Sequence, residues 1–159
     1  MRIETPRLTL ESITPLHAGR IVAGEPAPGE LWHPEYPLHD ELDPLGSLSA
    51  TADPHPVFTM YVVRTVTDGL AVGGLGFFGP PDEAGAVEVG YGLVESARGV
   101  GLATEALLAA LSTAAEHGAL SASADTEIAN LASRRVLEKA GFAESRRAGN
   151  TAYFTRSLC

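Results

Sequence analysis

Apolar and polar residues alternate in several short runs of the chain, which is the pattern of half-buried β-strands. The alternation is clearest in residues 86–94, where Glu88 falls on the face opposite to Val87 and Val89. A Thr-Asp-Gly turn signal joins two of the runs as a hairpin. The pattern predicts strands over residues 7–13, 57–66, 70–78, 86–94 and 121–126, from residue 142 onward, and over 151–158.

Three further segments have the features of helices. The first follows Thr14, an N-cap residue before a proline, and extends to residue 22 or 23. The second covers residues 102–117, where apolar residues recur at helical spacing up to the stop signal Gly118. The third covers residues 131–140, and Asn130 is expected to cap it.

Residues 24–56 differ from the rest of the chain. They hold seven of the eleven prolines and few apolar residues, so they predict a long loop with at most one short helix. A loop of this length inside a compact domain is usually functional or mobile. Trp32 and Tyr36 in this loop either line a substrate pocket or pin the loop to the core.

Length and composition restrict the class of protein. The 159 residues predict one domain, residues 1–159, with a sizeable core. The sequence has no run long enough to span a membrane and no signal-like start, so a cytoplasmic protein is expected. Cys159 is the only cysteine, which excludes a disulfide framework and a cysteine metal site. The histidines match no metal-ligand spacing, so no metal is expected.

The charges are unevenly distributed along the chain. The net charge of −9 argues against nucleic acid as a partner. Residues 21–63 contain seven acidic residues and no Lys or Arg, whereas the charged residues after Asn130 are mostly basic. One part therefore suits a cation and another an anion, unless both are ordinary solvated faces.

The most informative motif follows the fourth predicted strand. The glycine-rich turn Arg98-Gly99-Val100-Gly101-Leu102-Ala103 opens the second helix. Such a turn presents backbone N–H groups and a helix N-terminus to an anion, which indicates a diphosphate site. A dinucleotide fold would need a third glycine where Thr104 stands, and a phosphate-binding P-loop would need Gly-Lys-Ser/Thr, so both are disfavoured.

The Arg-x-x-Gly-x-Ala pattern of this turn resembles the acetyl-CoA signature of the GNAT superfamily of N-acetyltransferases. Residues 88–93 resemble the strand beside the cofactor in that family, and residues 130–133 and 137–142 resemble its later motif. The opening Thr5–Leu10 resembles the Rim-type branch, which acetylates the N-termini of ribosomal proteins.

The resemblance implies a GNAT fold of the α/β (α+β) class. It is a mixed, mostly antiparallel sheet of six to seven strands flanked by about four helices. It also implies acetyl transfer from acetyl-CoA to a primary amine, either a peptide N-terminus or a small molecule, by direct attack in a ternary complex. Two alternatives are an aminoglycoside- or polyamine-like acceptor and a non-catalytic acyl-CoA-binding module. We expect a cationic acceptor, no membrane or nucleic-acid partner, and a monomer or homodimer.

The resemblance also assigns residues to the cofactor. The backbone of Leu93 and Val94 would pair with the pantetheine arm, and Asn130 would bind that arm or an adjacent water. Arg134, with Arg135 or Lys139 as alternatives, would reach the 3′-phosphate. The pyrophosphate would be held by the turn, with Arg98 at its entry and Gly99, Val100, Gly101, Leu102, Ala103 and Thr104 around it.

Catalysis requires a base and an acid. An amine attacks only when neutral, so a base is needed, and Glu88 matches the family's active-site glutamate. Many members protonate the leaving thiolate with a tyrosine, but Leu137 stands at that position. Ser133 matches a serine that replaces it in the Rim-type branch, or else it only caps the helix. Tyr91 and Tyr153 are further candidates.

Overall fold

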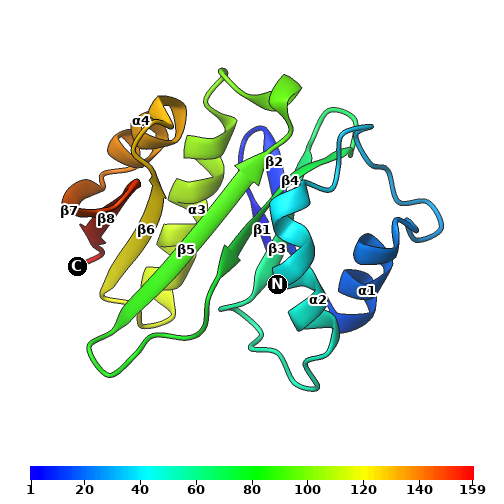
Figure 1. Cartoon of the computed structure of the whole chain (residues 1–159). Helices are drawn as coiled ribbons and strands as arrows, with labels where there is room; N and C mark the ends of the chain where they lie inside the picture. Colours follow the sequence, from blue (N-terminus) through cyan, green and yellow to red (C-terminus); the bar gives the residue numbers. More distant parts are fainter.

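The alternating segments form one mixed sheet of eight strands in the computed structural model, which describes residues 1–159 (Figure 1). The strand order is β1-β2-β3-β4-β5-β6-β8-β7, and only the β5–β6 pair is parallel. The strands are β1 (Arg2–Glu4), β2 (Leu8–Ser12), β3 (Met60–Thr65), β4 (Ala71–Phe77), β5 (Ala86–Leu93), β6 (Ser121–Glu127), β7 (Ala143–Ala148) and β8 (Thr151–Ser157).

Four α-helices flank the sheet. Helices α1 and α2 pack against each other, whereas α3 packs across β1, β2 and β5 behind the sheet, and α4 lies beside α3 and β6 (Figure 1). None of the helices has the length and apolar character needed to cross a membrane. The helices are α1 (Pro15–Ala23), α2 (Leu42–Ser49), α3 (Leu102–Glu116) and α4 (Leu131–Lys139), with 3₁₀ turns η1 (His39–Glu41) and η2 (Glu95–Ala97).

The GNAT fold expected from the sequence is confirmed, but the strand count was too low. The eighth strand is β1, three residues at the N-terminus that pair with β2, Ile3 lying opposite Leu10. Three residues are too few to show alternation, so no pattern in the sequence marks this strand. The helix predictions are confirmed to within one residue or so, including Thr14 and Asn130, whose side chains cap α1 and α4.

The sheet divides between β5 and β6. These strands pair only through Ala86, Val87 and Glu88, and beyond Glu88 they separate. Strand β6 remains paired with β8 over its whole length, so the separation leaves one edge of residues 89–93 without a neighbouring strand. An unpaired strand edge presents backbone N–H and C=O groups to a ligand.

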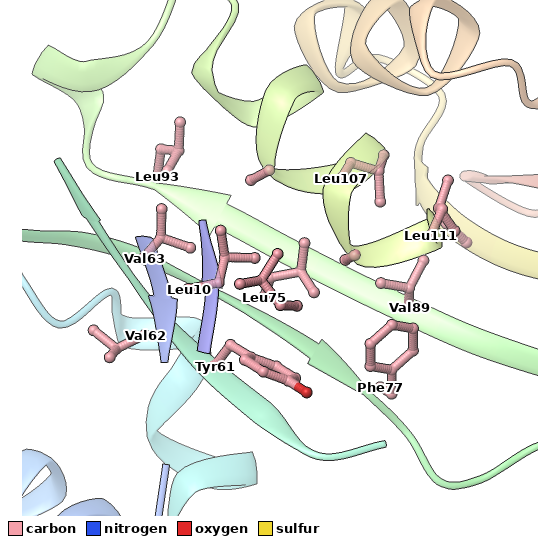
Figure 2. Packing of buried hydrophobic residues seen from close by; sticks show 14 of the residues in the cluster. Leu10, Tyr61, Val62, Val63, Leu75, Phe77, Val89, Leu93, Leu107 and Leu111 are labelled. Carbon is pink, nitrogen blue, oxygen red and sulfur yellow. The ribbon is translucent and has the colours of Figure 1, made fainter. Parts of the chain in front are cut away.

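The core lies between the sheet and α3. Val89 of β5 is buried with Leu107 and Leu111 of α3, and Figure 2 shows these side chains beside one another. Helix α3 faces the sheet with small alanines between its leucines, which lets the helix axis approach the strands closely. The start of α3, and the turn that precedes it, is therefore fixed relative to β5.

The proline-rich segment is a long loop with one short helix, α2, as predicted. Tyr36 is buried, its ring packs edge-on against Trp32 at 5.4 Å, and Trp32 forms a bridge to Ala71. These two aromatic residues therefore pin the segment to the sheet.

Glu30 also holds the segment against the sheet, through an ion pair with Arg64 of β3. Burial alone would raise the pKa of Glu30, but hydrogen bonds, led by that from the Ala27 backbone, lower it to about 2.

Candidate functional site

One large cavity, of about 1140 Å³, lies beside the unpaired part of β5. Its walls come from residues of the 38–59 segment, from β4 and β5, from the 97–104 turn and from α4. Apolar, polar and charged residues line the cavity together. The cavity brings together most of the residues that the sequence singled out.

The glycine-rich turn forms one wall of this cavity. Gly99 and Gly101 have φ angles of +85° and +83°, a conformation that residues with a Cβ rarely adopt. None of the backbone N–H groups from Gly99 to Thr104 donates a hydrogen bond to another protein atom. These free donors stand at the positive end of the 15-residue helix α3, so the turn suits an anionic group.

The N-terminal segment holds the turn in place. Nη1 of Arg7 donates to the carbonyl oxygen of Val100 at 2.8 Å, and Nε of Arg7 pairs with Glu105 on the first turn of α3 at 2.8 Å. The Thr5 hydroxyl donates to the same carboxylate at 2.6 Å. Burial raises the pKa of Glu105, but the bonds from Thr5 and Arg7 outweigh it and lower that pKa. The opening motif of the sequence thus has a defined structural role.

The two residues predicted to pair with a pantetheine arm differ in what they offer. Leu93 lines the cavity, and its carbonyl oxygen accepts a hydrogen bond from Nε of Arg98 at 2.9 Å. Val94 is fully buried and donates its N–H to Val72 at 2.8 Å, so this N–H is not available to a ligand.

The basic residues of α4 point in different directions. Arg135 and Lys139 line the cavity. Arg134 does not: its guanidinium donates to the carbonyl oxygen of Ile128 at 3.1 Å and lies 3.8 Å from Glu144. Of the three cations considered for a phosphate, the two alternatives therefore reach the cavity, and Arg134 is held by protein groups outside it.

Ser133 and Tyr91 meet at the cavity wall. Their hydroxyl oxygens lie 2.9 Å apart, and both residues line the cavity. The Ser133 N–H is also capped by the side chain of Asn130 at 3.1 Å, so this part of α4 is fixed. Burial raises the pKa of Tyr91, which keeps its hydroxyl protonated at neutral pH. Leu137 is fully buried in the core.

Glu88 is exposed on β5 and pairs with Ser123 where β5 and β6 are still joined. It faces away from the Val87 and Val89 row, as the alternation predicted. The residues that line the cavity begin two positions further along the strand, at Gly90, and do not include Glu88. Its role as the base stays a prediction.

Glu41 is the site residue that sequence reasoning did not single out. It lies at the end of η1, lines the cavity, and both of its carboxylate oxygens are shielded from solvent and pair with no side chain. Burial raises the pKa of Glu41 to about 7, since it outweighs the lowering by the Leu38 backbone, and the nearby Asp40 raises the pKa further. A weak signal existed, because glycines at 73, 74 and 76 of β4 indicate that another group approaches that strand closely.

The two charge regions of the sequence meet at this one cavity. The 38–59 segment contributes acidic side chains, and the glycine-rich turn and α4 contribute basic ones. The cavity therefore presents negative charge on one wall and positive charge on another. The acidic lining residues are Asp40, Glu41 and Asp53, and the basic ones are Arg98, Arg135 and Lys139.

His33, His55 and Cys159 make local contacts. Nδ1 of His55 accepts the N–H groups of Val57 and Phe58, and Nε2 of His33 lies 2.9 Å from the Ser96 hydroxyl. The structure contains no group of three or more His, Cys, Asp or Glu residues that could hold a metal ion. Cys159 is exposed beside Leu120, away from the cavity.

Comparison with known proteins identifies a family. A model described as the acetyltransferase (GNAT) domain matches residues 7–143. The uncharacterized N-acetyltransferase YjdG of Bacillus subtilis is 40% identical over 72 residues, a match that spans 45% of this chain and 43% of that protein. The chain therefore matches less than half the length of this relative.

Solved structures share the fold over the whole chain. The ribosomal L7/L12 α-N-protein acetyltransferase RimL, solved with coenzyme A, superposes with a TM-score of 0.73 and 18% identity, covering 99% of this chain and 98% of that one. The ribosomal-protein-S5-alanine acetyltransferase of Vibrio fischeri gives a TM-score of 0.70 and 17% identity, covering 99% and 97%. At these identities the likeness concerns the fold alone.

Proposed function

Because this chain belongs to the GNAT acetyltransferase family, we propose that it transfers the acetyl group of acetyl-CoA to a primary amine by direct attack within a ternary complex. The observation that carries the proposal is the single cavity in which free backbone donors at the start of α3 and an acidic wall open toward each other. No thiol lines the cavity, so nothing there supports an acyl-cysteine intermediate.

The glycine-rich turn fits the pyrophosphate of acetyl-CoA. A Cβ atom at Gly99 would meet no protein atom within 4 Å, so the space beside this backbone is open to a ligand. The unsatisfied N–H groups from Gly99 to Thr104 would donate to phosphate oxygens, and the dipole of α3 would add to the attraction. Arg98, which lines the cavity at the entry of the turn, supplies a positive charge.

The rest of the cosubstrate would extend along two walls. The pantetheine arm would lie in the gap between β5 and β6, where Leu93 lines the cavity and the strand edge is unpaired. Asn130 at the cavity wall is a further partner for this arm. Arg135 and Lys139 are placed to bind the 3′-phosphate, and we prefer them to Arg134 because that guanidinium is engaged by Ile128 and Glu144.

The hydroxyl pair of Tyr91 and Ser133 would supply the proton that the leaving thiolate needs. The pair lies on the α4 side of β5. At the α4 position where the resemblance places the family's tyrosine, this chain has the buried Leu137. The raised pKa of Tyr91 keeps a proton available, and the bond to Ser133 links the two hydroxyls into one donor unit.

The acceptor would be a cationic amine. Asp40 and Asp53 line the acceptor side of the cavity, and no Lys or Arg lies in residues 21–63 to offset them. A peptide N-terminus is the first acceptor class to consider, because Thr5–Leu10 resembles the Rim-type branch and one fold neighbour is a ribosomal-protein acetyltransferase.

The proposed function is tested by an acceptor screen. The purified protein is mixed with acetyl-CoA and panels of short peptides, polyamines and aminoglycosides, and the release of free CoA thiol is followed. Acetylation of at least one primary amine, confirmed by a mass gain of one acetyl group, is expected. Acetyl-CoA binding by calorimetry without transfer to any amine would instead indicate a non-catalytic binding module.

A further inference from the structure

The carboxylate of Glu41 is shielded from solvent in an unusual way. Most shielded carboxylates in proteins accept several hydrogen bonds or pair with a cation, but Oε1 and Oε2 of Glu41 pair with no side chain or cation, and only the Leu38 backbone lies near enough to lower the pKa of the group. The side chain lies against the backbone of β4, where a Cβ atom on Gly74 would overlap Oε1. Gly92 on the neighbouring strand is covered in the same way by Leu38, whose Cδ1 would lie 2.7 Å from a Cβ there.

The glycines of β4 and β5 therefore form a recess that η1 fills. Gly74 and Gly92 are paired across the two strands, so their missing side chains leave one shared space on that face of the sheet. Leu38 anchors η1 in this space by apolar contact, and Glu41 occupies the rest with a carboxylate. An apolar side chain would fill the recess at lower cost, so the carboxylate is not explained by packing.

On these grounds, and resting on the proposed acetyl transfer, we propose that Glu41 is the general base that takes a proton from the acceptor amine. The residue lines the cavity that contains the proposed thioester site, on the acidic wall where a cationic acceptor would enter. Because both carboxylate oxygens are shielded in this conformation, the Glu41 side chain must turn toward the cavity to take the proton, directly or through one water.

The proton balance of the reaction assigns one step to each wall. The acceptor ammonium gives one proton to the Glu41 carboxylate, and the neutral nitrogen then forms a bond to the acetyl carbonyl carbon. As the carbon–sulfur bond breaks, the thiolate takes a proton from the Tyr91–Ser133 pair. That pair is restored by the second proton that the nitrogen loses on forming the amide. Glu41 returns its proton to solvent, so one proton is released for each ammonium acetylated.

The environment of Glu41 suits this role. With a pKa of about 7, roughly half of the Glu41 carboxyl groups are ionised at neutral pH and able to accept a proton, and a proton once accepted is still held. The β4 strand beneath it carries no titratable residue, and no cation lies within salt-bridge distance of it. The charged or titratable groups that interact with it are Asp40 and Tyr36, and Asp53, His55 and Tyr91 line the same cavity.

Two other assignments compete with this one. The first is that Glu88 is the base, as the family resemblance implies, although it does not line the cavity. The second is that Glu41 is only a counter-ion that binds the acceptor. A counter-ion affects the KM of the acceptor, whereas a base affects kcat and the pH profile.

The experiment compares Glu41→Gln with Glu88→Gln and with Asp43→Asn, a nearby exposed acid that does not line the cavity. We measure thiol release with the best amine of the acceptor screen across the pH range, and acetyl-CoA affinity by calorimetry. Glu41→Gln should lower kcat by roughly 10²–10⁴-fold. It should also remove the ionisation near pH 7 from the profile of kcat/KM, which wild type, Glu88→Gln and Asp43→Asn keep. Acetyl-CoA affinity should be unchanged in all three variants.

A weakly basic acceptor provides the second measurement. An O-alkyl hydroxylamine is already neutral at pH 7 and needs no base to free its lone pair before attack, so the loss caused by Glu41→Gln should be several-fold smaller with it than with an alkylamine. An equal loss with both acceptors, or a change in KM alone, would overturn the proposal.

The experiment distinguishes the role of Glu41 from the proposed acetyl transfer. A wild-type enzyme that acetylates amines while Glu41→Gln retains its rate and pH profile would refute the role of Glu41 and leave the proposed function intact. Transfer of the effect to Glu88→Gln would do the same and restore Glu88 as the base. Failure of the wild type to acetylate any amine would overturn both.

Discussion

The carboxylate of Glu41 lies directly on the backbone of Gly74, so closely that a methyl group at position 74 would overlap it. The two residues are 33 positions apart in the sequence, and the contact exists because η1 fills the recess left by the glycines of β4 and β5. The position of the proposed base is therefore set by the absence of a side chain on a neighbouring strand.

This relationship predicts that Gly74→Ala impairs catalysis. The added methyl group must displace the Glu41 carboxylate, and a displacement of about 1 Å costs on the order of 10²-fold in rate. We expect kcat to fall while acetyl-CoA affinity is retained. Gly46→Ala is the matched control, because a Cβ there meets nothing within 4 Å. If Gly74→Ala were as active as Gly46→Ala, the carboxylate would not need its present position.

Glu41 should also make stability depend on pH. Its pKa is raised from 4.5 to about 7 in the folded state. Below pH 4.5 the group is protonated in both states, so the stability is fully present. It is lost as the pH rises to about 7, by roughly 3 kcal/mol at most, since the unfolded chain ionises first. Urea unfolding should show Glu41→Gln to be more stable than wild type at about pH 8.5 and equal to it near pH 4. Equal stability at both values would contradict the unpartnered burial.

Gly101→Val should abolish acetyl-CoA binding. Its side chain would obstruct the backbone of the turn and disfavour the φ of +83° that presents the N–H groups. Gly24→Val carries the same backbone strain, at a φ of +73°, but lies at the end of α1. Both variants should lose stability, and only Gly101→Val should lose heat of CoA binding in calorimetry. Equal CoA affinity in the two would refute the assignment of the turn.

Arg7→Ala should weaken acetyl-CoA binding without direct contact between Arg7 and the ligand. Arg7 holds the carbonyl oxygen of Val100 and the Glu105 carboxylate, so its loss frees the turn. A loss of about 1.5 kcal/mol corresponds to an increase in the acetyl-CoA KM of roughly 10-fold. Arg2→Ala removes a fully peripheral ion pair with Glu4 and should leave this KM unchanged. An unchanged KM in Arg7→Ala would show that the turn holds its shape without this tether.

The acidic wall should make acceptor binding sensitive to salt. The acceptor KM should rise with ionic strength, because salt screens the attraction between a cationic amine and the cavity. Asp40→Asn combined with Asp53→Asn should raise the KM at low salt and flatten this dependence. Glu116→Gln with Glu138→Gln changes the net charge equally but away from the cavity, and should do neither. A salt-independent acceptor KM in wild type would show that the acidic wall does not attract the acceptor.

The sequence by itself determined much of the fold and one part of the site. Alternation and helix spacing located seven of the eight strands and three of the four α-helices, and Gly99, Gly101 and the following helix defined an anion cradle. These features are local, because a turn and a helix start depend on residues that are neighbours in the chain. The uneven distribution of acidic and basic residues was also visible, but the sequence did not show that the two regions line one cavity.

Only the tertiary structure decided which residues share the cavity. It directed Arg135 and Lys139 into the cavity and Arg134 away from it, a difference that follows from the rotation of α4 against its neighbours. It joined Tyr91 to Ser133 across 42 positions. It also shielded the carboxylate of Glu41 from solvent and left its neighbours Asp40 and Asp43 exposed. Burial and pKa depend on contacts between distant segments, and no periodicity in a single sequence encodes those contacts.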